Sequence, residues 1–244
     1  MHRAPTSLKM SDIYISCLDG QFFVFDLETV KRLRVDHNIS GILAGTLPQV
    51  PQQSVFLGLP LQLLPEEAAL LVFKRIARIV DEKATHAPLL AAVGDEAAVH
   101  DKVRDLELAD PVSAVSTPAI TADDQYRPVL VPESAISHLY GSAKFHVYKF
   151  LHDRAYFVSP GLRFGCHFLA YPGDPLRYHS HFLVRGLEWD EEFDLLDAIG
   201  SGRLGTGVKK AWVVGGLRKP AQPDTTATGQ QEFVSFSIEW AGFG

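Results

Sequence analysis

The sequence has little cysteine, and its two cysteines, Cys17 and Cys166, stand far apart without a CxxC spacing. This excludes a cysteine-rich zinc module and a disulfide scaffold, and it is compatible with a reducing compartment. No apolar run approaches the ~18 residues that a membrane-spanning helix needs. Residues 1–10 contain no apolar signal-peptide core. We therefore expect a soluble, intracellular protein without a membrane span.

The chain also lacks a surplus of positive charge, because its formal net charge is −6. This argues against binding nucleic acid through overall charge alone. The charge is unevenly placed: residues 1–138 hold 12 Lys and Arg against 18 Asp and Glu, whereas residues 139–219 hold 11 against 8, with five histidines besides. A local basic surface attracts phosphate even on an acidic chain. Three surplus charges are few, so tight RNA binding would need partner chains.

The first part of the chain predicts a small mixed domain. Asp19-Gly20 lies between two β-rich runs and predicts a hairpin over residues 12–26, followed by a short helix at 27–36. We interpret residues 37–64 as loop with one short strand near 54–59. Residues 65–82 predict a helix, because a proline suits its first turn and apolar residues recur at helical spacing.

Residues 83–131 differ in composition, being rich in Ala, Asp, Val, Pro and Thr. We interpret them as a linker or flexible insertion, with an exposed helix near 95–107 as one option. This divides the chain into an N-terminal α+β domain (1–82), the linker (83–131) and a C-terminal domain (132–244).

The C-terminal part predicts further helices and strands, which makes the expected fold class α/β (α+β). One helical stretch spans 132–153 and is interrupted or merely weakened at Gly141. Another spans 190–200, begins at Asp190 and ends near Gly200 and Gly202. The strand candidates are 155–158, 164–171, 178–187, 208–216 and 231–240.

The most informative motif is Tyr171-Pro-Gly-Asp-Pro-Leu-Arg-Tyr-His179. The Pro-Gly-Asp-Pro stretch is a turn by its composition. If strands flank it as a hairpin, Tyr171 and His179 emerge near the same end of a sheet. The plainer interpretation is that Tyr171 is an aromatic residue at a strand end and His179 a surface histidine.

A second motif is Gly205-Thr-Gly-Val-Lys-Lys210. A lysine pair at the start of a strand is usually solvated edge charge. The glycines of this motif would instead let backbone and substrate approach closely. In a strand over 208–216, Lys210 would share one face with Trp212, and Lys209 would point the other way.

A tyrosine, a histidine and a lysine are the groups that metal-free RNA cleavage needs. RNA supplies its own nucleophile, the 2′-OH, so the protein must supply a base, an acid for the 5′-oxygen and positive charge beside the phosphorane. His179 is a natural acid near neutral pH, and Lys210 is a compact phosphate-binding charge. Tyrosine is a weak base, so Tyr171 either needs a nearby cation such as Lys210 or mainly orients the 2′-OH. Neither a metal nor a cofactor is required.

Two metal-binding alternatives are weaker. His179-Ser-His181 has an HxH spacing, but residues 182–187 hold no acid to complete such a site, so we interpret His181 as structural. The acidic residues between 188 and 197 suggest the carboxylate cluster of a metal-dependent nuclease. They fit better as the first turn and solvated face of a helix. Neither a P-loop nor a GxGxxG fingerprint is present.

Three stretches of the chain resemble the tRNA-splicing endonuclease family: residues 150–165, 171–179 and 202–210. The Tyr-Pro-Gly-Asp-Pro form is similar to that of the family's eukaryotic catalytic subunit for the 3′ splice site. The resemblance covers about residues 140–240, and the N-terminal hairpin and helix are similar to that subunit less specifically. The family's catalytic tyrosine, histidine and lysine map onto Tyr171, His179 and Lys210.

This resemblance implies a C-terminal nuclease-type domain with a mixed β-sheet flanked by helices. It implies cleavage of precursor tRNA at the 3′ splice site, leaving a 2′,3′-cyclic phosphate and a 5′-OH. It also implies a nuclear heterotetramer with a second catalytic subunit, whose arginine pair clamps the RNA, and two structural subunits. The alternatives are a non-catalytic assembly subunit of the same complex, or a metal-dependent nuclease.

Overall fold

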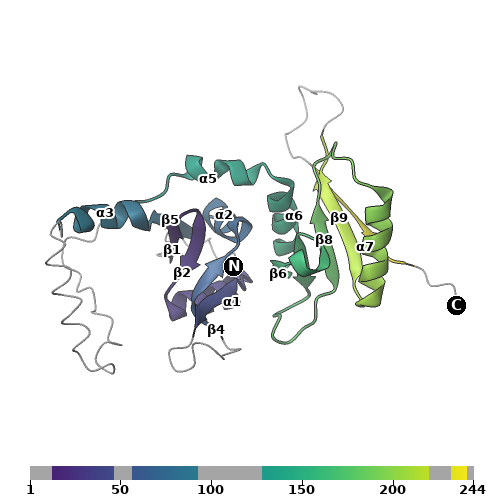
Figure 1. The fold of residues 1–244 in the computed structure, drawn as a ribbon, viewed down its shortest axis with the longest axis horizontal. Helices are drawn as coiled ribbons and strands as arrows, with labels where there is room; N and C mark the ends of the chain where they lie inside the picture. The colour runs from purple at the N-terminus through teal and green to yellow at the C-terminus, as the bar shows by residue number, and fades with distance from the viewer. Residues whose placement is uncertain (1–12, 47–56, 93–127, 220–231, 241–244) are drawn as a thin grey trace, which may run out of the picture.

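The structure, a computed structural model, describes residues 13–46, 57–92, 128–219 and 232–240. Within these residues each half of the chain forms a mixed five-stranded sheet, so the predicted fold class is confirmed (Figure 1). None of the described helices is long and apolar enough to cross a bilayer. The N-terminal half consists of β1 (Ile13–Leu18), β2 (Gln21–Val24), α1 (Leu27–His37), β3 (Ile42–Thr46), β4 (Leu57–Leu63), α2 (Pro65–Phe73), β5 (Ala77–Asp81) and α3 (Glu82–Ala92).

The N-terminal sheet has the strand order β3-β4-β2-β1-β5, in which only β1 and β5 run parallel. The predicted hairpin is confirmed: Asp19 and Gly20 join β1 to β2 with positive φ angles of 47° and 78°, as the two central residues of a type I′ turn require. The predicted helix that follows is also confirmed as α1. It begins after Asp26, whose carboxylate accepts the Thr29 N–H at 2.7 Å.

Two predictions for this half are wrong. The helix expected over 65–82 ends at Phe73, Arg75 takes a positive φ of 57°, and Ala77–Asp81 form a strand. The spacing of Ile76 and Val80 fits a helix, but pairing with β1 and burial against the core decide for a strand. The described residues between 37 and 64 contain two strands, β3 and β4, which pair with each other, where we expected a loop with one short strand.

Both ends of the expected linker contact the N-terminal sheet. Helix α3 follows β5 directly. On the other side, the Asp81 N–H donates to the Val129 carbonyl at 2.8 Å, and the Val131 N–H donates to the Ile79 carbonyl at 2.9 Å. The exposed helix considered for 95–107 lies outside the described residues, and the division into domains stays a prediction.

The C-terminal half forms the second sheet, with the order β10-β9-β8-β7-β6 and a single parallel pair, β8 and β9. Helix α6 lies on the face toward the N-terminal half and α7 on the opposite face (Figure 1). The elements of this half are α5 (Glu133–Tyr140), α6 (Ala143–His152), β6 (Phe157–Pro160), the short 3-10 helix η1 (Leu162–Phe164), β7 (Phe168–Tyr171), β8 (Phe182–Gly186), α7 (Leu195–Gly207), β9 (Ala211–Leu217) and β10 (Phe233–Ile238).

The helices of this half confirm one prediction and correct another. The expected interruption at Gly141 separates α5 from α6. The helix expected over 190–200 instead spans Leu195–Gly207 and is capped by Asp194. The glycines expected to end it lie inside it. At Gly205, also within this helix, an added Cβ would stand 2.6 Å from the Lys210 carbonyl oxygen, so glycine lets the helix lie close to the start of β9.

One hydrophobic core runs through both halves, with Ile15 and Leu70 from the first and Phe145 and Phe168 from the second. Helix α2 packs against α6 at this junction. Glu67 is buried there, with 1% of its surface exposed. The two halves therefore share buried contacts.

The Glu67 carboxylate accepts hydrogen bonds from both sides of the junction. The donors are the Leu64 N–H at 2.9 Å, the Gly41 N–H at 3.3 Å and the hydroxyl of Tyr148 on α6 at 3.4 Å. Burial outweighs these bonds and raises the pKa of Glu67 to about 7.

Candidate active site

Three strands of the C-terminal sheet meet in register at one end of the sheet. Ala170 of β7 pairs with Phe182 of β8, and Phe182 pairs with Ala211 of β9. The backbone of His181 continues this ladder, since its N–H donates to the Ala170 carbonyl at 2.9 Å and its carbonyl accepts the Ala211 N–H at 3.0 Å. The next residue outward on each strand therefore lies at the same end of the sheet.

These next residues are Tyr171, His181 and Lys210. The Tyr171 ring is half-buried and packs against the cluster of apolar side chains that includes Leu183 and Trp212. Ser159 of the neighbouring strand β6 donates a hydrogen bond to the Tyr171 hydroxyl at 3.3 Å. The phenol is therefore held at the sheet end by packing on one side and by a hydrogen bond.

His179 lies in the connection between β7 and β8, with an exposed side chain. The strand predicted over 178–187 begins only at Phe182, so His179 precedes it and belongs to the loop. The chain does reverse after Tyr171, because β7 and β8 are antiparallel neighbours, but the hydrogen-bonded turn runs from Asp174 to Tyr178, later than the predicted Pro172–Pro175. Turn composition thus located the reversal to within a few residues, and both predicted strands are too long.

Lys210 is half-buried where α7 gives way to β9. Lys209 before it has a positive φ of 57°, and the Lys210 N–H donates to the Gly205 carbonyl at 2.8 Å. Its Nζ donates to the Val208 carbonyl at 3.2 Å. The strand predicted over 208–216 starts at Ala211, and the expectation that Lys209 points away from Lys210 is wrong because neither lysine lies in the strand.

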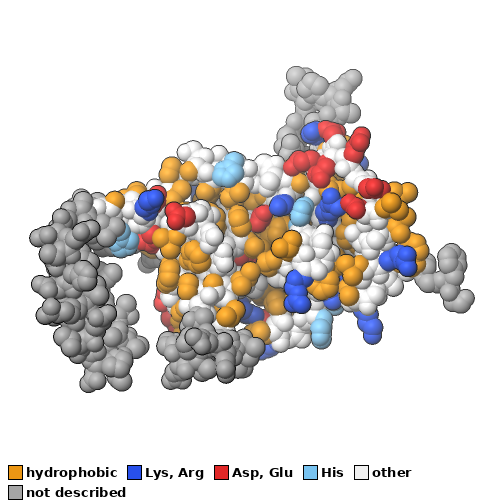
Figure 2. All heavy atoms as spheres, in the orientation of Figure 1, with side chains coloured by type: hydrophobic (Ala, Val, Ile, Leu, Met, Phe, Trp, Pro, Cys, Tyr) orange, Lys and Arg blue, Asp and Glu red, His pale blue; other side chains and the backbone are white. Residues whose placement is uncertain are grey.

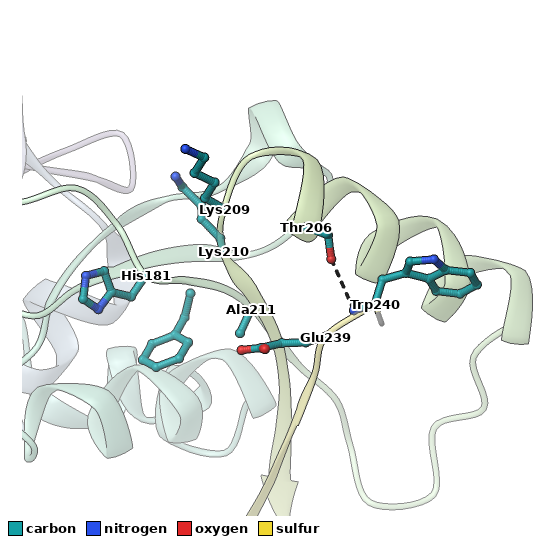
Figure 3. Close-up of a pocket in the computed structure, with 8 residues that line it drawn as sticks. His181, Thr206, Lys209, Lys210, Ala211, Glu239 and Trp240 are labelled. Atoms are coloured by element: carbon teal, nitrogen blue, oxygen red, sulfur yellow. Dashed lines mark hydrogen bonds between the residues drawn. The ribbon is translucent and has the colours of Figure 1, made fainter. Parts of the chain in front are cut away.

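Both lysines line a cavity of about 430 Å³ at this sheet end. Figure 3 shows them leaving the start of β9 in the same general direction, whereas the Trp240 ring points away from them. The Trp240 N–H donates to the Thr206 hydroxyl at 3.2 Å, which ties the residues after β10 to α7. The full lining is His181, Phe182, Thr206, Lys209, Lys210, Ala211, Glu239 and Trp240.

The structure therefore places Tyr171 and Lys210 at one end of the sheet. His179 lies in the loop that connects β7 to β8 at this end. The cavity itself contains His181, which the sequence pattern had indicated to be structural. Sequence analysis also missed Glu239 and Trp240. The β9–β10 register, in which Trp212 pairs with Ile238, brings these two residues to the start of β9. This register cannot be predicted from the sequence of either strand alone.

Three of the acidic residues between 188 and 197 have separate partners. Asp190 pairs with Lys219, Asp194 caps α7, and Asp197 lies 3.6 Å from Arg185. Among the described residues, no three His, Cys, Asp or Glu side chains are grouped so as to hold a metal ion. Figure 2 shows Lys, Arg and His side chains on the lower part of the C-terminal half, where β9 begins, and acidic side chains toward its upper part.

Comparison with known proteins identifies both halves of the chain. Residues 13–82 match the model of the TSEN34-like N-terminal domain, and residues 142–222 match the catalytic C-terminal domain of tRNA intron endonuclease. The chain is 35% identical to the probable tRNA-splicing endonuclease subunit sen34 of Schizosaccharomyces pombe, over 94% of this chain and 98% of that protein.

Further relatives match the whole chain or a part of it. The chain is 26% identical to the tRNA-splicing endonuclease subunit Sen34 of Homo sapiens, over 94% of this chain and 99% of that protein. A tRNA-splicing endonuclease of Hyperthermus butylicus is 39% identical over 29% of this chain and 39% of that protein. The chain therefore belongs to the Sen34 family of tRNA-splicing endonuclease subunits, and it is a tRNA intron endonuclease.

Proposed function

We propose that this chain cuts precursor tRNA at the 3′ splice site, using Tyr171, His179 and Lys210. The observation that carries the proposal is their placement: Tyr171 ends β7, Lys210 precedes β9, and His179 lies in the loop that leaves the same end of the sheet. The match to a catalytic domain across residues 142–222 supports it, since that range contains all three residues.

In the proposed reaction, the 2′-OH of the RNA attacks the adjacent phosphate in line, and the bond to the 5′-oxygen breaks. His179, exposed and free to approach the RNA, donates the proton to the departing 5′-oxygen. Lys210 places its positive charge beside the phosphorane. Tyr171 either takes the 2′-OH proton or orients that hydroxyl while a solvent water takes the proton. The products are a 2′,3′-cyclic phosphate and a 5′-OH, and the reaction uses neither a metal nor a cofactor.

We also propose that the chain works within a nuclear heterotetramer, beside a second catalytic subunit and two structural subunits. The Sen34 relatives are themselves named as subunits, which supports an assembly. The modest positive charge of residues 139–219 fits an RNA-binding surface that partner chains complete.

The proposal is tested on the chain co-expressed with its presumed partner subunits. Cleavage of an intron-containing precursor tRNA in EDTA is compared for wild type, His179→Ala and the neighbouring control His181→Ala, with the cut position and end groups determined. We expect His179→Ala to lose about 10²- to 10⁴-fold in 3′-site cleavage, with a much smaller loss in the control.

Unchanged 3′-site cutting by His179→Ala would leave this chain as a non-catalytic assembly subunit. Loss of wild-type cutting in EDTA would favour a metal-dependent nuclease. A loss confined to His181→Ala would move the acid to the residue that lines the Lys210 cavity.

A further inference from the structure

An ion pair from the N-terminal half reaches the turn beside the candidate active site. Arg34 of α1 donates from Nη2 to Oδ1 of Asp174 at 2.6 Å and from Nε to Oδ2 at 2.9 Å. The two residues are 140 positions apart, and their side chains are 28% and 30% exposed. A two-point pairing of guanidinium and carboxylate fixes orientation as well as distance. Arg34 therefore restrains the direction of the Asp174 side chain.

Asp174 in turn organises the segment between Tyr171 and His179. Its Oδ1 accepts the Leu176 N–H at 2.8 Å. Its backbone carbonyl accepts the N–H groups of Arg177 at 2.8 Å and Tyr178 at 3.0 Å. The side chain and backbone of one residue thus hold three residues of the turn, Leu176, Arg177 and Tyr178.

The turn is also closely packed on itself. A Cβ added at Gly173 would stand 2.7 Å from the Tyr178 ring, so this ring lies directly on the glycine backbone. Tyr178 is the residue immediately before His179. The restraint on Asp174 is therefore passed through the turn to the backbone that carries His179.

The charge state of Asp174 fits this role. The hydrogen bond from Arg34 is the main cause that lowers the pKa of Asp174 to about 2, helped by the Leu176 N–H and by the charge of Arg177. The same bond raises the pKa of Arg34. Both partners are thus charged throughout the pH range in which a histidine acid works.

We propose that Arg34 is a positioning residue for RNA cleavage, which acts through Asp174 to fix the turn that places His179 relative to Tyr171 and Lys210. The inference rests on the proposed function of these three residues. Its physical basis is that a reaction in which groups must align in line with a phosphate loses rate steeply when one of them is displaced.

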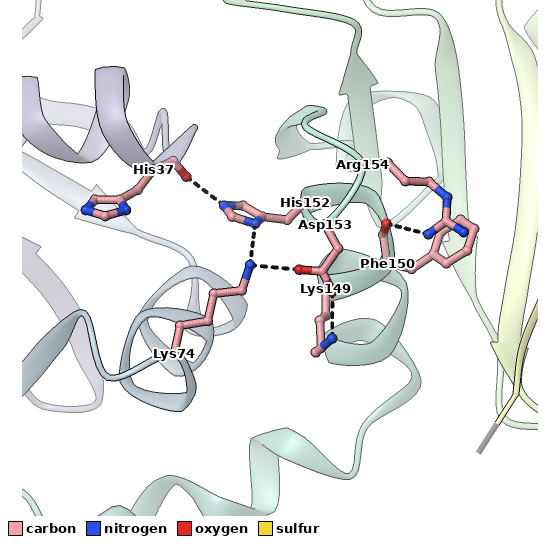
Figure 4. A network of polar contacts seen from close by, with 7 residues as sticks. All are labelled: His37, Lys74, Lys149, Phe150, His152, Asp153 and Arg154. Atoms are coloured by element: carbon pink, nitrogen blue, oxygen red, sulfur yellow. Dashed lines mark hydrogen bonds and ion pairs between the residues drawn. The ribbon is translucent and has the colours of Figure 1, made fainter. Parts of the chain in front are cut away.

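A second polar bridge between the two halves supplies a matched control. Lys74, just after α2, pairs with Asp153 at 2.7 Å, with side chains 28% and 37% exposed. Lys74 Nζ also lies 3.1 Å from His152 Nδ1, and His152 Nε2 lies 2.6 Å from the His37 carbonyl (Figure 4). This bridge is similar in burial to the Arg34 pair but joins α2 to the end of α6, not to the turn.

The test uses the co-expressed complex at saturating precursor tRNA in single-turnover reactions. Cleavage at the 3′ splice site is measured for Arg34→Ala, Asp174→Asn, Lys74→Ala and His179→Ala, with 5′-site cleavage in the same tube as the internal standard. We expect Arg34→Ala and Asp174→Asn to lower the 3′-site rate by about 10- to 100-fold, with 5′-site cleavage, RNA affinity and melting temperature close to wild type. Arg34→Lys should restore part of the rate, and Lys74→Ala should keep it.

Each opposing result overturns a distinct statement. A wild-type 3′-site rate in both Arg34→Ala and Asp174→Asn, or an equal loss in Lys74→Ala, rules out positioning by Arg34. A loss of RNA affinity with an unchanged rate at saturation makes Arg34 an RNA contact instead. Wild-type 3′-site cutting by His179→Ala overturns the proposed function itself, whatever the Arg34 variants do.

Discussion

The two halves of the molecule are built from similar parts but differ in what their sheet ends carry. Each holds a five-stranded sheet with one parallel pair, β1 with β5 in the first and β8 with β9 in the second. The candidate residues Tyr171, His179 and Lys210 all belong to the second half. The first half contributes contacts that cross the junction, including Glu67 in the core and Arg34 at the turn. This comparison supports our proposal that the second half performs the chemistry and that the first half holds it in place.

Among the experiments that test this difference between the halves, we expect the largest effect from replacing the two lysines before β9. Replacing Lys210 by Ala removes the charge proposed to stabilise the phosphorane, and we expect a loss of about 10²- to 10³-fold in the cleavage rate. Lys209→Ala removes a neighbouring charge from the same cavity and should cost only a few-fold, mainly in RNA affinity. Single-turnover rates and binding constants separate the two. Equal rate losses would mean that the site needs local charge and not a particular lysine.

The next effect concerns the support that the first half provides through Glu67. Burial raises the pKa of Glu67 from 4.5 to about 7, so the folded protein holds this proton more tightly than the unfolded chain. Below pH 4.5 the carboxyl group is neutral in both states, so folding has no free-energy cost from burying its charge. Above pH 7 the group is charged in both states, and this cost is complete. The free energy of unfolding should therefore fall as the pH rises through this window, by about 3 kcal/mol from this one group.

The measurement compares denaturant unfolding of wild type and Glu67→Gln between pH 4.5 and 7.5. Other groups titrate in the same range, among them His152 and His146, whose pKa values burial lowers. They are present in both proteins, so the difference between the two curves isolates Glu67. A difference that stays constant across this range would mean that Glu67 is not protonated in the folded protein at pH 5.

A third, smaller effect tests whether α7 needs a glycine where it lies close to the start of β9. Gly205→Ala places a Cβ 2.6 Å from the Lys210 carbonyl oxygen, and we expect it to destabilise the fold by about 1–3 kcal/mol. Gly200 lies in the same helix, and a Cβ added there would have nothing within 4 Å, so Gly200→Ala should stabilise the helix by about 0.5–1 kcal/mol. Thermal unfolding distinguishes them, and destabilisation by both would mean that the close contact at Gly205 is not the cause.

Sequence reasoning succeeded where the signal was local. The Asp19-Gly20 pair located a hairpin, Gly141 located a break between two helices, and the Pro172–Pro175 turn located the chain reversal after Tyr171. Each of these signals depends on the backbone preferences of a few neighbouring residues. They gave the order of the elements around the site, and the family match confirmed what kind of protein it is.

Sequence reasoning failed where a contact between distant segments decides the structure. Residues Ala77–Asp81 form a strand because β1 pairs with them as a parallel neighbour, and Gly205 is needed in α7 because a Cβ there would meet the Lys210 carbonyl oxygen before β9. The candidate chemical residues were named by type and spacing. Their surroundings, such as Glu239 in the cavity that Lys210 lines, follow from a strand register that a single sequence does not display.

The smallest effect compares the contributions of the two polar bridges between the halves to stability. Lys74→Ala removes a pair that is about one-third exposed, so water screens most of its energy, and we expect a loss of about 0.2–1 kcal/mol. His152 and Lys149 remain to contact the His37 carbonyl and Asp153. Arg34→Ala should cost a similar amount in denaturant unfolding, because its pair has nearly the same exposure. If Lys74→Ala instead costs several kcal/mol, the Lys74 bridge contributes strongly to the stability of the junction. The two bridges would then be similar only in their exposure.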